Sequence, residues 1–232
     1  MGYAIFLAVV LLAPALLLSF LKKAQTGFYL LYVLSFLIPL ILPLPQIERL
    51  LLFCYAGFEG TFLSLLAKTY AELAIIFLMI GILAVPKTPL SLLPALFWGW
   101  SFGMGKLVRD ILLVLFHPLH HFYGYSQFAS FLTPLLVIRG ALEAQVEMAV
   151  FGLLALWFHS RKRKDRSQSP LILIAVFCIK TLHALVLSFA QSTPQGALVS
   201  ILYTSSILPL LSVLGYAMLF VSYRKAKGVG TN

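Results

Sequence analysis

The recurrence of long apolar segments constrains this chain more than any other feature of its sequence. Predominantly apolar runs of about 20 residues, the length that crosses a bilayer core as a helix, follow one another along all 232 residues. Hydrophobic residues make up 61% of the chain and charged residues only 10%, whereas a soluble domain is about 25% charged. The sequence therefore predicts an integral membrane protein.

The apolar runs indicate helices and not strands. A backbone inside lipid must satisfy its own hydrogen bonds, and these runs are too long for barrel strands and do not alternate. We expect an all-α bundle of about seven transmembrane helices, forming one membrane domain over residues 1–232. The expected spans are 3–20, 26–43, 63–85, 92–116, 128–158, 169–190 and 196–222.

Two segments do not fit the pattern of one apolar run of about 20 residues for each helix. The fifth span is long, and Pro134 is expected to mark the start of its helix. Residues 46–62 fit three descriptions: an interfacial amphipathic helix, a re-entrant turn or an extension of the third span. The amino terminus lacks the basic region of a signal peptide, so we expect it to stay as the first helix.

Basic residues in the gaps between spans predict the orientation. Eleven of them fall on one side of the membrane and only Arg49 on the other, which is a strong positive-inside pattern. This predicts an outside amino terminus and a cytoplasmic carboxyl terminus, in a multi-pass protein of the cell (plasma) membrane. The net charge of +10 then reflects topology and anionic lipid, not nucleic acid. The eleven are Lys22, Lys23, Lys87, Arg161, Lys162, Arg163, Lys164, Arg166, Arg224, Lys225 and Lys227.

Charged residues inside the expected spans point to a buried polar site. Each ionised group at the bilayer centre costs about 2.5–3.5 kcal/mol on insertion scales, so these groups should pair within the bundle. Lys106 and Asp110 are spaced i,i+4, and Arg139, Glu143 and Glu147 recur every four residues. The groups within spans are Lys68, Glu72, Lys106, Arg109, Asp110, Arg139, Glu143, Glu147 and Lys180.

The depth of these groups suggests that they share one site. Because neighbouring spans run in opposite directions, most of them fall in the central or outer half of the membrane, together with His183. Four helices would then contribute charge at similar depth. The alternative is a salt-bridge network that only fixes helix register.

The segment Phe102-Gly-Met-Gly-Lys-Leu-Val-Arg-Asp110 resembles the FGxGHGxxE motif of the YhfC family of membrane proteins. That family is grouped with the PrsW-type and CAAX-type glutamate intramembrane proteases and with the anterior-pharynx-defective subunit of gamma-secretase. The resemblance covers about residues 65–190. Glu72, Arg139 and His183 match a family glutamate, arginine and histidine, whereas Ala71, Lys106, Asp110 and Glu147 replace family glutamates or histidines.

The resemblance implies a seven-helix fold and two alternative functions. As an enzyme, the protein would hydrolyse membrane-embedded peptides, with Glu72 or Glu143 as general base and Lys106 stabilising an oxyanion. As a scaffold, like the gamma-secretase subunit, it would bind a partner membrane protein. A small-solute or ion carrier is a third class. The catalytic group would be Glu72, Lys106, Glu143, Glu147 and His183, supported by Lys68, Arg109, Asp110, Arg139 and Lys180.

We expect no cofactor and no metal ion. The sequence contains no Walker loop, dinucleotide fingerprint or nucleophile elbow. His117, His120 and His121 form a cluster on the outer side, but no carboxylate or cysteine lies near them in sequence to complete a metal site. Gly99, Gly103 and Gly105 are expected to allow close helix approach.

Overall fold

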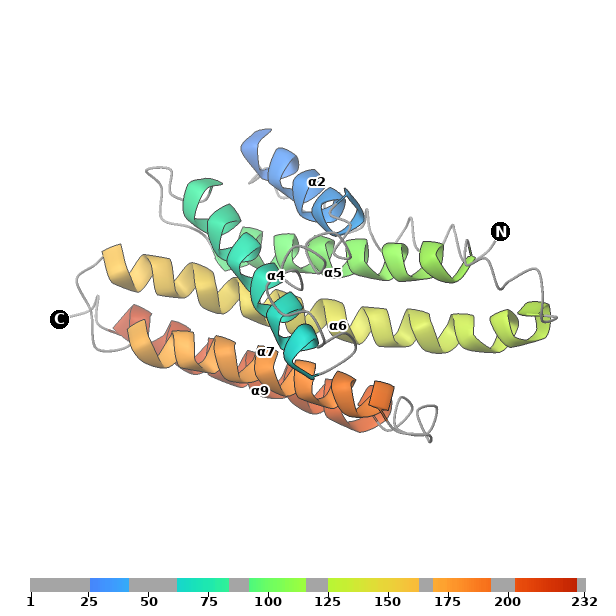
Figure 1. Cartoon of the computed structure of the whole chain (residues 1–232). Helices are drawn as coiled ribbons and strands as arrows, with labels where there is room; N and C mark the ends of the chain where they lie inside the picture. The colour runs from blue at the N-terminus through green and yellow to red at the C-terminus, as the bar shows by residue number, and fades with distance from the viewer. Residues whose placement is uncertain are drawn as a thin grey trace.

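The computed structural model describes residues 26–41, 62–83, 92–115, 125–162, 169–192 and 203–228 (Figure 1). Within these ranges the regular structure is entirely helical, with six α-helices, one π-helical turn and no strand, so the all-α prediction is confirmed. The elements are α2 (Thr26–Ile41), α4 (Phe62–Leu83), α5 (Leu92–Leu115), α6 (Tyr125–Lys162), α7 (Ser169–Ser192), η2 (Tyr203–Ile207) and α9 (Leu208–Gly228).

The helices lie where the apolar runs predicted them. The bounds of α2, α4, α5 and α7 differ from the expected ones by two residues or fewer at each end. The last helix continues to Gly228, six residues beyond the expected end. The first expected span, the histidine cluster at 117–121 and all of the segment 46–62 except Phe62, where α4 begins, lie outside the described residues.

The expected start of the fifth helix at Pro134 is wrong. The helix α6 begins at Tyr125 and runs through Pro134 for 38 residues without a break. A proline inside a helix removes one backbone hydrogen bond but need not end the helix, and α2 likewise contains Pro39. The helical preference of the apolar residues on both sides outweighs the loss of that one bond.

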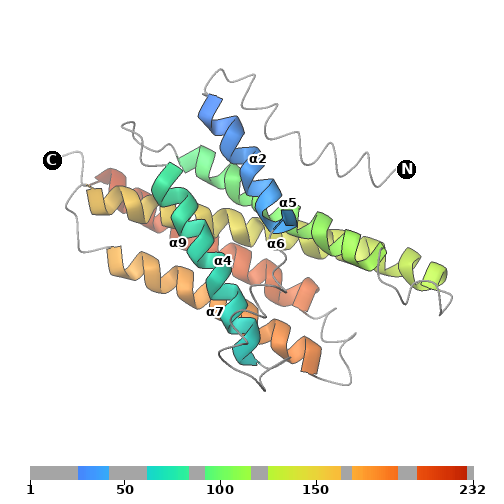
Figure 2. The same cartoon turned by 45° about the horizontal axis from the view of Figure 1, so that its top comes forward.

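The long helix α6 lies at the centre of the bundle. It packs against α5 along one side and against α7 and α9 along another, while α4 crosses it obliquely and α2 packs on α5 (Figures 1 and 2). Phe151, Leu153 and Leu154 of α6 are fully buried in the main hydrophobic core. Other helices thus surround α6 over much of its length.

Two helices among the described residues are long and apolar enough to cross a membrane. They are Val137–Ser160 within α6 and Ser205–Arg224, which covers most of α9. Two thirds of the first segment is buried inside the protein, compared with 28% of the second. The first segment therefore lies mainly in the core, whereas most of the second, which is slightly more apolar, lies on the outer surface.

Glycines let α5 lie very close to α6. A Cβ atom added to Gly99 would lie 2.6 Å from the Cα of Met148, and one added to Gly103 would lie 2.6 Å from the Cβ of Ala144. Both distances are too short for a real contact, so neither position has room for a side chain. The expected close approach is confirmed, and it fixes the position of Lys106, one turn further along α5, relative to α6.

Candidate functional site

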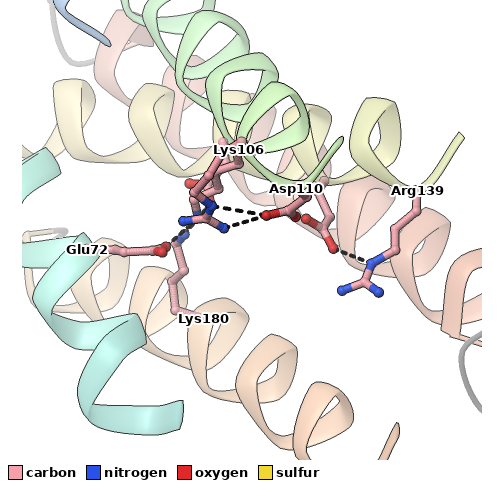
Figure 3. Close-up of polar contacts among 8 residues, drawn as sticks. Glu72, Lys106, Asp110, Arg139 and Lys180 are labelled. Carbon is pink, nitrogen blue, oxygen red and sulfur yellow. Dashed lines mark hydrogen bonds and ion pairs between the residues drawn. The ribbon is translucent and has the colours of Figure 1, made fainter. Parts of the chain in front are cut away.

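Four charged side chains from four helices meet in the interior of the bundle (Figure 3). Lys106 of α5 donates hydrogen bonds to Oε2 of Glu72 on α4 and, at 2.8 Å, to Oε1 of Glu147 on α6. Lys180 of α7 donates to the same Oε1 atom at 2.5 Å. All four residues are buried. We call Glu72, Lys106, Glu147 and Lys180 the central quartet.

The position of Lys106 corrects one expected pairing. Lys106 and Asp110 are one helical turn apart, but Asp110 accepts hydrogen bonds from its neighbour Arg109, at 2.9 and 3.0 Å. Lys106 lies on the buried face of α5, with its ammonium group 5.1 Å from the centre of the Phe102 ring. Two carboxylates from other helices reach the ammonium group there, and they replace the local partner that the spacing suggested.

Two further ion pairs lie beside the quartet on α5 and α6. They are Arg109–Asp110 and Arg139–Glu143, the latter with a distance of 2.8 Å between Nε and Oε1. We call them the outer pairs, and all four side chains are more exposed than those of Lys106, Glu147 and Lys180. His183 of α7 interacts electrostatically with Glu143. The structure thus brings the sequence-predicted charges of α5, α6 and α7 into one region.

The charges of this region balance. The quartet holds two carboxylates and two ammonium groups, and each outer pair holds one carboxylate and one guanidinium group. Such mutual neutralisation is what makes buried charge tolerable in a low-dielectric interior. Lys68 lies on α4, and its side chain is outside the described part.

Some hydrogen-bonding capacity in the region remains unused. Among the described residues, Oε2 of Glu147 and Nη1 of Arg109 are buried and have no hydrogen-bond partner. A buried polar atom without a partner costs about 1–3 kcal/mol. The first atom can accept a hydrogen bond from another group, and the second can donate one.

A contact between α4 and α7 was not predicted from the sequence. The hydroxyl groups of Tyr70 and Thr181 lie 2.8 Å apart, and the Tyr70 ring packs edge-on against Phe177. Tyr70 precedes Glu72 by two residues and Thr181 directly follows Lys180. The sequence signal for this contact was the position of both polar residues close to charged residues within the spans. In the structure the contact joins α4 to α7 near the quartet.

The ion pairs determine which reactions the side chains of this region could catalyse. Both carboxylates of the quartet are bound by ammonium groups, and Glu143 is bound by Arg139. No group of three metal-binding side chains is close enough to hold a metal ion within the described ranges. The catalytic roles assigned to Glu72, Lys106, Glu143, Glu147 and His183 stay predictions.

Comparison of the chain with protein-family models, with curated proteins and with solved structures finds no match.

Proposed function

We propose that this chain is a multi-pass integral membrane protein of the plasma membrane, with about seven spans and an outside amino terminus. The observation that supports the membrane assignment is a distribution of polar and apolar side chains opposite to that of a water-soluble protein. Charged groups lie inside the bundle, whereas large apolar side chains such as Leu30, Leu171 and Val213 are at least 60% exposed on α2, α7 and α9. Water would penalise such a surface, and lipid favours it.

We propose further that the protein acts as a non-catalytic scaffold that binds partner membrane proteins. A general base must be able to take up a proton, and ammonium groups bound to a carboxylate oppose its protonation. The carboxylates of Glu72 and Glu147 are buried against Lys106 and Lys180. This arrangement supports a structural role, in which the ion pairs connect α4, α5, α6 and α7. It agrees with a distant relation to the gamma-secretase subunit.

The scaffold proposal is tested by replacing the quartet carboxylates. Glu72→Gln and Glu147→Gln should each lower the thermal midpoint of the purified protein in detergent, because each removes a carboxylate that a buried ammonium group binds. Asp110→Asn is the matched control, since Asp110 pairs with Arg109 outside the quartet, and it should lower the midpoint less. Unchanged midpoints in both quartet variants would reject the structural role.

A second function, peptide hydrolysis in the membrane, is favoured by the electrostatic interaction between Glu143 and His183. A carboxylate and an imidazole in one site can serve as an acid–base pair. Glu143 would act as the base on water. The probe is a fluorescent single-span peptide reconstituted with the protein in liposomes. Cleavage that disappears in Glu143→Gln, with an unchanged thermal midpoint, would establish the enzyme and reject the scaffold.

A further inference from the structure

One row of side chains on α6 changes from charged to apolar along the helix. Arg139, Glu143, Glu147, Phe151 and Ala155 are each four residues apart, so each side chain lies next to the one before it, on a stripe that turns about 40° around the helix at every step. We call them the α6 stripe. Its first three members are charged, whereas Phe151 and Ala155 are buried and apolar.

The change occurs near the middle of the membrane-length segment. Glu147 lies ten residues after Val137 and thirteen before Ser160, the ends of that segment, which is about 15 Å and 20 Å at 1.5 Å per residue. Arg139 lies two residues from the Val137 end. The charged members therefore occupy one half of the segment, and the apolar members occupy the other half.

Exposure falls steadily along the charged half. The side chain of Arg139 is 26% exposed, that of Glu143 12% and that of Glu147 4%. The antiparallel helix α5 shows the same trend, from 37% at Asp110 to 9% at Lys106. Since two antiparallel helices show the gradient in the same direction, exposure falls with depth in this part of the bundle and not along one helix alone.

Unused hydrogen-bonding atoms lie at both ends of this gradient. Nη1 of Arg109 belongs to an outer pair and Oε2 of Glu147 belongs to the quartet, and neither has a partner among the described residues. Water molecules commonly satisfy such atoms when the surroundings are polar. The surroundings here are polar because the outer pairs and His183 lie next to the quartet.

From these observations we propose that the outer pairs, His183 and the central quartet line a one-sided access route for water. Water reaches the quartet from the Arg139 end of α6 and goes no further, because the stripe continues as Phe151 and Ala155. The proposal rests on the membrane orientation given above, in which the Arg139 end faces outside. The ligand of the site is therefore water. If the protein cleaves peptides, the water for hydrolysis would enter from one side of the membrane only.

Cysteine labelling tests the route directly. In a chain carrying Cys54→Ala and Cys178→Ala, the variants Arg139→Cys and Glu143→Cys are compared with Ala155→Cys on the same stripe. The probe is a charged, membrane-impermeant methanethiosulfonate, applied to right-side-out and inside-out membrane vesicles. Because a thiol reacts as the hydrated thiolate, the first two should react at least about tenfold faster than the third. Their reaction should occur in right-side-out vesicles only.

The natural chain provides a second measurement that needs no charge removal. A water-soluble carbodiimide with a glycine ester should tag Glu143 in right-side-out vesicles, as read by peptide mass spectrometry, and should tag it far less in inside-out vesicles. Equal labelling of residues 139, 143 and 155, or no tag on Glu143, would overturn the route. Labelling from the inside alone would instead reject the orientation. Neither result depends on whether peptides are cleaved or on the thermal midpoints, so the scaffold proposal is judged separately.

Discussion

Lys106 and Lys180 share one oxygen atom of Glu147, but their places in the quartet differ. Lys106 also binds Glu72, whereas Lys180 binds Glu147 alone among the quartet carboxylates. Removal of Lys106 would leave Glu72 without its ammonium partner. Removal of Lys180 would leave both carboxylates bound to Lys106.

This difference predicts unequal effects of equivalent replacements. Lys106→Met should lower the free energy of unfolding by about 3–5 kcal/mol, the usual cost of breaking a buried pair, and Lys180→Met should lower it by less. The measurement is unfolding in mixed micelles followed by circular dichroism. Arg224→Met, at an exposed position on α9, serves as the control. Equal losses for the two lysines would argue against the pairing pattern.

At the scale of elements, the packing of α5 on α6 depends on glycine. A Cβ atom added to Gly103 would meet Ala144 of α6, where its neighbours are backbone and a short side chain that cannot move aside. Gly81 on α4 differs, because an added Cβ would meet only the far end of the Phe158 side chain at 3.2 Å.

We therefore expect Gly103→Ala to destabilise the protein by about 1–3 kcal/mol, the range for overpacked sites. Gly81→Ala should be close to neutral, because the gain in helix propensity offsets a small shift of the Phe158 ring. The same unfolding assay compares the two variants. A neutral Gly103→Ala would mean that α5 and α6 lie further apart than described.

The elements were easier to predict than their contacts. Apolar runs located α2, α4, α5 and α7 closely, because each run has the length and composition of one helix. The partner of Lys106 was not predicted, since i,i+4 spacing indicates a local pair while the actual partners are 34 and 41 residues away. Such long-range pairs depend on how the helices pack, and the spacing of residues within one helix does not indicate which residue of another helix lies opposite.

In a membrane-spanning bundle of this shape, α9 presents an apolar surface to lipid. Val213 lies near the middle of the Ser205–Arg224 segment and is 65% exposed. A charge placed there would have no partner within the bundle.

Val213→Arg should reduce insertion, because an arginine at mid-bilayer costs about 2.5–3.5 kcal/mol on insertion scales. Tyr223→Arg, near the end of the same segment, is the control and should insert normally, since the side chain can reach the headgroups. The measurement is the fraction of protein recovered in carbonate-washed membranes. Full insertion of both variants would place the outer face of α9 in water.

The buried quartet can be measured through the coupling between Glu72 and Lys106, two charges that only the folded bundle brings together. In a double-mutant cycle of Glu72→Met and Lys106→Met, each single change should destabilise strongly. The double variant should recover much of the loss, since Lys180 and Glu147 still neutralise each other. A coupling energy of about 2 kcal/mol or more supports the quartet. Additive effects within about 0.5 kcal/mol would contradict it.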